Sequence, residues 1–183
     1  MSKVYVFLAD GFEEIEGLMV VDLLRRAGVE LETVSIMGRR DVTGRSDITV
    51  MADRLFEEVS SYEDGDMLVL PGGMPGTTYL EEYAPLREWI LKYDQAGKRL
   101  AAICAAPTVY GKMGLLKGRK ATCYPEMEDL LLGAVPVTDA VVTDGNYTTS
   151  RGLGTAIQFS LELISLLQGS ETAEKVAKSV VFH

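Results

Sequence analysis

Short apolar runs alternate along this chain with stretches of helical periodicity, and this alternation constrains the fold more than any other feature. The first run, residues 4–9, ends at the turn pair Asp10 and Gly11. An uninterrupted apolar run is typical of a parallel strand that is covered on both faces. In residues 13–27 apolar side chains recur at helical spacing, and Gly28 follows as a C-cap. The N-terminal segment therefore predicts a strand followed by a helix.

The same alternation continues to the C-terminal part of the chain. Further strands are expected at residues 31–36, 48–50, 67–70, 99–103, 120–123 and 140–143. Further helices are expected at residues 86–93, 108–113 and 155–168. Strands separated by helices predict an α/β protein with a parallel, doubly wound sheet. The length of 183 residues suits one domain, so we expect a single domain over residues 1–183.

The amino-acid composition limits the classes of partner and the cellular compartment that we expect for this chain. The chain has 18 basic and 27 acidic residues, a net charge of −9, which argues against a nucleic-acid partner because phosphate binding needs a positive surface. Two cysteines cannot form a disulfide framework, so we expect a reducing, cytoplasmic setting. The apolar run at the N-terminus is too short for a signal peptide or a membrane span, and no membrane association is expected.

Metal binding is not expected either. His183 is the only histidine, and Cys104 and Cys123 are not spaced as a zinc pair. In open α/β sheets the ligand crevice lies at the carboxyl ends of the strands, so the loops that follow strands are the places to search for a site. The loops with unusual chemistry are residues 10–16, 71–76, 104–107 and 150–155.

Cys104 lies where an expected strand ends and a helix begins, with Pro107 suited to the first helical turn. A thiol at such an elbow is exposed to the positive end of the helix dipole, which favours the thiolate. Free cysteine is also among the most buried residue types and often acts as a small hydrophobe. The local pattern allows both a nucleophile and a core residue.

Glu16 shares its side of the expected helix with Phe12, Met19, Val20 and Leu23. Its carboxyl is therefore either buried or at the solvated edge of an apolar stripe. If it is buried beside Cys104, an ionised carboxylate would raise the pKa of the thiol, whereas a protonated carboxyl could donate a hydrogen bond to the thiolate.

Two glycine-containing loops could bind an anion. In "LPGGMPG" the backbone N–H groups of Gly72 and Gly73 could hold an oxyanion, although a Gly-Gly pair after a strand is commonly only a turn. In "TSRGLGT" a Gly-x-Gly precedes a helix, where it could bind an anion or simply permit tight packing.

Four motifs in this order resemble the ThiJ/PfpI family: "ADGFEEIE" with Glu16, "LVLPGG", "AAICAAP" with Cys104 and "TSRGLGT". The resemblance covers nearly the whole chain. It implies a flavodoxin-like, doubly wound, mostly parallel sheet with helices on both faces, like that of class I glutamine amidotransferases. It also implies a homodimer that needs no cofactor. By this resemblance Cys104 is the reactive, oxidisable nucleophile and Glu16 its protonated partner, while Gly73 and Ala105 supply oxyanion N–H groups.

The chain departs from the family pattern at Tyr124, in "ATCYPEME", where many members have a histidine. A tyrosine, with a reference pKa of about 10, is not a general base at neutral pH, but its hydroxyl can orient a substrate. Without a Cys-His pair, a protease or amidotransferase mechanism is not expected.

The resemblance implies a glyoxalase or deglycase activity on methylglyoxal or early glycation adducts, linked to oxidative stress. The alternative is a redox-sensing or chaperone-like protein in which Cys104 is oxidised to a sulfinate without turnover. Cys123 is either a core residue or a partner that forms a disulfide with oxidised Cys104. The sequence does not assign Arg45 or Ser46 to the site, nor does it show whether Arg25 or Arg26 reaches a second copy's crevice.

Overall fold

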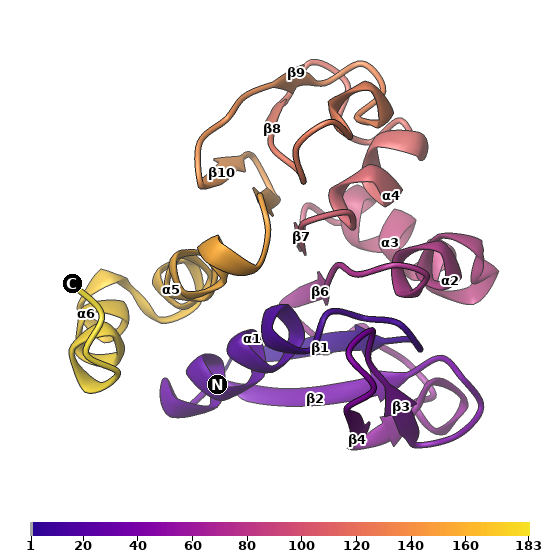
Figure 1. The fold of residues 1–183 in the computed structure, drawn as a ribbon, viewed down its shortest axis with the longest axis horizontal. Coiled ribbons are helices and arrows are strands. Elements are labelled where there is room, and N and C mark those ends of the chain that lie inside the picture. The colour runs from indigo at the N-terminus through magenta and orange to yellow at the C-terminus, as the bar shows by residue number, and fades with distance from the viewer. Residues whose placement is uncertain (1) are drawn as a thin grey trace.

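A seven-stranded sheet organises residues 2–183, the part of the chain that the computed structural model describes (Figure 1). The strand order is β10-β11-β7-β6-β1-β2-β5. The strands are β1 (Lys3–Leu8), β2 (Glu30–Ser35), β5 (Arg54–Leu55), β6 (Met67–Leu70), β7 (Arg99–Ile103), β10 (Val141–Asp144) and β11 (Tyr147–Ser150). Neighbouring strands are parallel except β10, which runs antiparallel to β11 at one edge. The sheet is therefore mostly parallel.

The central strands separate two apolar clusters. In β1 the side chains of Tyr5 and Phe7 belong to one cluster, whereas those of Val4, Val6 and Leu8 belong to the other. All of them are buried, because successive side chains of a strand point to opposite faces and both faces are covered. This burial on both faces explains why β1 reads as a continuous apolar run.

Helices cover both faces of the sheet. On one face lie α1 (Glu14–Arg26) and α5 (Ala156–Gln168), and α6 (Ser170–Ser179) packs beside α5 at the edge of the molecule (Figure 1). The other face is covered by α2 (Gly76–Glu82), α3 (Ala84–Gln95) and α4 (Pro107–Lys112). The expected doubly wound α/β class is confirmed. In residues 2–183 no helix is both long and apolar enough to span a bilayer.

Smaller elements decorate the sheet. β3 (Asp41–Thr43) and β4 (Thr49–Met51) form an antiparallel ribbon, and β8 (Lys120–Ala121) pairs in parallel with β9 (Val135–Pro136). The short 3-10 helices of residues 2–183 are η1 (Phe56–Glu58), η2 (Glu128–Leu130) and η3 (Leu153–Thr155).

Two expected strands were wrong as members of the main sheet. Residues 48–50 fall in the β3–β4 ribbon, and β5 takes the edge position beside β2 instead. Of residues 120–123 only β8 is a strand, and it pairs with β9 outside the main sheet. Both segments are short, and short β-rich runs do not reveal which partner they pair with.

The sequence pattern also missed α2, α6 and β11. The β11 strand reads "YTTS", which lacks an apolar run, yet all four residues are buried. Its hydroxyls are hydrogen-bonded: Thr149 Oγ1 accepts from the Thr122 N–H, and Ser150 Oγ donates to the Ala140 carbonyl. Buried hydroxyls with partners cost little, so a central strand can be polar in composition.

Candidate active site

The loops that follow four neighbouring strands meet at the carboxyl edge of the sheet. The loop after β1 leads into α1 and Glu16, the loop after β6 carries Gly72 and Gly73, and Cys104 directly follows β7. Gly152 follows β11. Parallel strands bring these distant segments together because all of their carboxyl ends lie at one edge.

Cys104 is held at a strained elbow. Its φ is 64°, in the left-handed region that residues other than glycine rarely adopt. The Cys104 N–H donates to the Ser150 carbonyl at 2.9 Å, and the Cys104 carbonyl accepts from the Tyr124 N–H at 2.8 Å. Pro107 begins α4, as expected. Hydrogen bonds on both sides of the residue fix the elbow, which leaves the thiol partly exposed.

Glu16 is buried beside this thiol. Its side chain is 1% exposed, and Glu16 Oε2 accepts a hydrogen bond from the Gly72 N–H at 3.0 Å. The carboxyl also lies within hydrogen-bond contact of the Cys104 thiol. The Glu16 N–H donates to Glu13 Oε2 at 2.8 Å, so Glu13 caps the first turn of α1. Glu16 is therefore a buried group aimed at Cys104 and not a solvated residue at the edge of the helix.

The carboxyl and the thiol perturb each other. Burial raises the pKa of Glu16 to about 7, and hydrogen bonds from its neighbours oppose that rise. Burial and the nearby Glu16 charge raise the pKa of Cys104 to about 12. These two values describe a coupled pair that loses its protons in two well-separated steps. Between those steps the pair shares one proton and carries one negative charge.

Two backbone N–H groups favour that charge on sulfur. The N–H groups of Gly73 and Ala105 hydrogen-bond to the Cys104 sulfur and lower the pKa of the thiol, against the larger effect of burial. Gly73 has a φ of 90°, and an added Cβ there would overlap the backbone around Phe12 and Glu13. The glycine therefore lets the two loops approach closely and aims its N–H at the sulfur.

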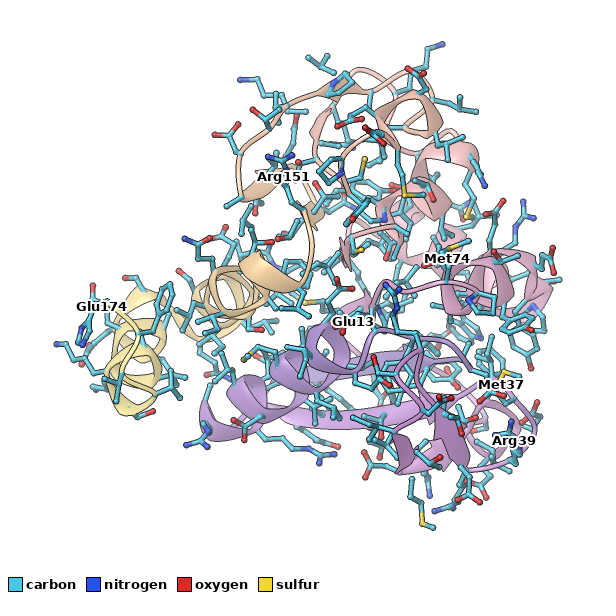
Figure 2. All side chains as sticks on the ribbon, in the orientation of Figure 1. Glu13, Met37, Arg39, Met74, Arg151 and Glu174 are labelled. Carbon is cyan, nitrogen blue, oxygen red and sulfur yellow. The ribbon has the colours of Figure 1, made fainter. Side chains whose placement is uncertain are left out.

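A cavity of about 240 Å³ opens above the thiol. Its lining consists of Arg45, Gly73, Met74, Cys104, Ala105, Tyr124 and Met127. Figure 2 shows Glu13 near the middle of the molecule and Met74 to one side of it. Tyr124 is 52% exposed at the rim, and at this position its ring is free to contact a bound molecule. A larger cavity of about 460 Å³ lies between β10 and α5, but its lining has no nucleophile.

At this cavity or against its thiol lie the predicted site residues Glu16, Gly72, Gly73, Cys104, Ala105 and Tyr124. Gly72 packs tightly against the pair, since an added Cβ would lie 2.5 Å from both Cys104 Cβ and Glu16 Oε2. Sequence reasoning missed Met74 and Met127 and left Arg45 unassigned. Arg45 is in a polar turn without periodicity, and nothing in the local pattern indicated that the β3–β4 ribbon folds toward Cys104.

Other candidates lie outside the cavity. Arg25 forms an ion pair with Asp53 and Arg26 with Asp22, and neither arginine lines the cavity. Cys123 is 1% exposed and packs in the cluster on the opposite face from the one that Cys104 contacts. Among residues 2–183, no group of three or more histidine, cysteine, aspartate or glutamate side chains is arranged to hold a metal ion.

The model of the DJ-1/PfpI family matches residues 2–166, and this match includes every residue of the cavity. The chain belongs to the DJ-1/PfpI family. It is 38% identical to Protein dj-1beta of Drosophila melanogaster over 184 residues, covering 99% of this chain and 98% of that protein. It is 37% identical to a deglycase of Pyrococcus abyssi, covering 91% of this chain and 99% of that protein.

Another relative is longer than this chain. Protein DJ-1 homolog B of Arabidopsis thaliana is 39% identical over the whole chain, which spans only 42% of that protein's length. Among solved structures, oxidized Toxoplasma gondii DJ-1 has a TM-score of 0.95 at 36% identity and covers 100% of this chain and 99% of that chain. Drosophila melanogaster DJ-1beta has a TM-score of 0.94 at 36% identity, with 100% of both chains covered. The expected family and the flavodoxin-like fold are confirmed.

Proposed function

We propose that this DJ-1/PfpI domain is a cysteine-dependent enzyme of the glyoxalase or deglycase type, acting without cofactor or glutathione on methylglyoxal or early glycation adducts. The observation that carries the proposal is the Cys104 thiol, which faces a buried Glu16 carboxyl and two backbone N–H groups in one open cavity. The named deglycase among the relatives supports the same class of reaction.

The first step forms a bond between sulfur and carbon. The Cys104 thiolate adds to the aldehyde carbon of methylglyoxal, and the carbonyl electrons move to oxygen as an alkoxide. The N–H groups of Gly73 and Ala105 stabilise the developing negative charge, a role that backbone donors fill well because they are already oriented. Glu16 holds the shared proton and can protonate the alkoxide, which gives a hemithioacetal.

The second step moves hydrogen between adjacent carbons. Ionised Glu16 removes the proton from the former aldehyde carbon and returns it to the neighbouring carbon. The hydroxyl proton of the hemithioacetal passes to the oxygen of that neighbouring carbon, so that the hemithioacetal becomes a thioester of lactate. Water then cleaves the thioester, releasing lactate and the free thiol. The balance is methylglyoxal plus water giving lactate, with no external oxidant or reductant. A Glu16 pKa of about 7 suits both directions of proton transfer at neutral pH.

Tyr124 replaces the histidine that a cysteine protease would need. We propose that its exposed ring and hydroxyl orient the substrate at the rim, while proton transfer depends on Glu16. The cavity of about 240 Å³ accommodates a three-carbon dicarbonyl. Since the rim is open at Tyr124, a glycated side chain or nucleotide could present its adduct from outside.

The backbone N–H groups of Gly73 and Ala105 also favour a second function. A sulfinate formed on Cys104 would be an anion held by the N–H groups of Gly73 and Ala105, with protonated Glu16 donating to one of its oxygens. This arrangement suits a redox sensor or a stress-linked chaperone that responds once per thiol. The two functions differ in turnover.

The deciding experiment compares the wild type with Cys104→Ser for methylglyoxal consumption and lactate formation, without added glutathione. Formation of many lactate molecules per wild-type protein, and loss of this activity in Cys104→Ser, would support the enzyme function. No turnover in either protein would favour the redox-sensing function.

We also propose a single cytoplasmic domain that forms a homodimer through an exposed apolar face. Ile15 and Leu18 of α1 are exposed. Ile48 in the turn before β4 is also exposed, as is Met51 in β4, which is 73% exposed. The start of α1 contacts the turn before β4, so these side chains lie in neighbouring segments. The net charge of −9 supports the absence of a nucleic-acid partner. Sedimentation of Met51→Glu against the wild type tests the dimer.

A further inference from the structure

Glu14 is another buried glutamate of α1, two residues before Glu16 and outside the proposed chemistry. Its side chain is 2% exposed and contacts the turn at residues 44–48, which joins β3 to β4. Glu14 Oε1 accepts from the Ser46 N–H at 2.8 Å and from the Ile48 N–H at 3.4 Å. Glu14 Oε2 is buried and has no hydrogen-bond partner. Burying a carboxylate is costly, and the hydrogen bonds that offset this cost come from the backbone of the 44–48 turn.

The turn that Glu14 binds carries Arg45, a residue of the cavity lining. The backbone on both sides of the Arg45 side chain is tied to the α1 entrance: the Arg45 N–H donates to the Phe12 carbonyl at 2.9 Å, and the next N–H, that of Ser46, donates to Glu14. The turn also holds Asp47 at a φ of 61°, which is an unfavourable conformation without support. These contacts fix the position of the Arg45 backbone, and with it the point from which the Arg45 side chain extends.

Gly44 leaves room for the Glu14 carboxyl because it has no side chain. An added Cβ at Gly44 would overlap the Glu14 carboxyl carbon and Oε1. The φ of Gly44 is not in the left-handed region, so the absence of a side chain serves space and not backbone conformation. Glu14 and Gly44 therefore form a matched pair across the two segments.

We propose that Glu14 is a positioning residue that holds Arg45 at the cavity by binding the backbone of the 44–48 turn. This inference rests on the proposed function of the cavity, since it assigns a residue that acts on the Cys104 site through Arg45. The charged groups that act on Glu16 are Glu13, which raises the Glu16 pKa, and Arg45, which lowers it. Releasing the turn would move the Arg45 charge and so change the titration of the Glu16 and Cys104 pair.

The test measures the rate of Cys104 alkylation by iodoacetamide against pH, in a Cys123→Ser background so that one thiol remains. The rate rises as the pair loses its first proton. Arg45→Met removes the favourable charge and should move this midpoint upward, by on the order of half a pH unit. Glu14→Ala releases the turn and should move the midpoint in the same direction.

Glu14→Gln is the matched control. It removes the same charge as Glu14→Ala, but its amide oxygen still accepts from the Ser46 N–H, and its NH₂ group replaces an oxygen that accepts no hydrogen bond. The proposal expects a midpoint near that of the wild type for Glu14→Gln, and a double variant Glu14→Ala, Arg45→Met that shifts no further than Arg45→Met alone. Equal shifts in the two Glu14 variants, or additive shifts in the double variant, would overturn it.

Gly44→Ala keeps the test decisive if Glu14→Ala fails to fold. Its methyl group displaces the Glu14 carboxyl without changing any charge, so it should also raise the midpoint, and an unchanged midpoint in folded Gly44→Ala would contradict the proposal. Alkylation needs no turnover. A failure of lactate formation in the wild type would therefore count against the enzyme function and leave this result intact.

Discussion

The buried Glu16 carboxyl lies against the partly exposed Cys104 thiol, and burial raises the pKa of both groups. The pair costs stability, because each group keeps its proton more tightly in the folded protein than in the unfolded chain. The proposed mechanism uses this arrangement, because it needs a proton held next to a nucleophile.

Glu16→Gln should flatten the pH dependence of stability. The Glu16 pKa is about 7 in the folded state and 4.5 in the reference state, so the folded state is favoured below pH 4.5 and loses that advantage as pH rises to 7. The neutral amide has no such loss, so relative to the wild type Glu16→Gln should gain up to about 3 kcal/mol between pH 4.5 and pH 7. Urea unfolding of both proteins at pH 5 and pH 8 measures this, and an equal difference at both pH values would contradict it.

Iodoacetamide should label Cys104 well before Cys123. Cys104 is partly exposed at the cavity, whereas Cys123 is 1% exposed and burial raises the pKa of its thiol to about 11. Peptide mass spectrometry over time should show a large difference in the two rates under native conditions. In urea the difference should disappear, which is the internal control.

Gly72→Ala should displace the pair. An alanine Cβ would lie 2.5 Å from both Cys104 Cβ and Glu16 Oε2, and overpacking of this kind costs about 1–3 kcal/mol. Gly154→Ala is a matched control in the nearby η3 helix, since its Cβ would meet open space. The unfolding temperature Tm and the rate of lactate formation should both fall for Gly72→Ala and stay unchanged for Gly154→Ala. An active and stable Gly72→Ala protein would exclude the tight packing described for this loop.

Tyr124→His should change activity more than stability. Tyr124 is half exposed, and substitutions at such positions usually alter stability by less than about 0.5 kcal/mol. A histidine, with a reference pKa of about 6.5, would supply a base at the rim and should raise kcat above neutral pH. Tyr124→Phe keeps the ring and removes only the hydroxyl, so a rise in KM there would report substrate orientation. No change of the pH profile in Tyr124→His would show that Glu16 alone moves the proton.

Peroxide should convert Cys104 to a sulfinate without linking it to Cys123. The backbones adjoin, because the Tyr124 N–H donates to the Cys104 carbonyl, but the two thiols pack in clusters on opposite faces. Non-reducing mass spectrometry after stepwise peroxide should therefore find oxidised Cys104 and no disulfide-linked peptide. A linked peptide would show that Cys123 can rotate to resolve an oxidised Cys104.

By itself the sequence determined the α/β class, the strands β1, β2, β6 and β7, and the elbow at Cys104. These features are local: burial on both faces demands an apolar run, and a helix begins where Pro107 allows it. Glu16 could also be singled out, since a carboxylate among apolar helix positions is a local anomaly.

Only the tertiary structure decided whether Glu16 was solvated or buried. It also decided that Arg45 lines the cavity and that Glu14 contacts the 44–48 turn. These outcomes depend on contacts between segments far apart in the chain: Glu16 with Gly72 and Cys104, and Glu14 with the 44–48 turn. A polar turn and a strand such as β11 have no periodic signal, because their hydrogen bonds are made with distant partners and not with their neighbours in sequence.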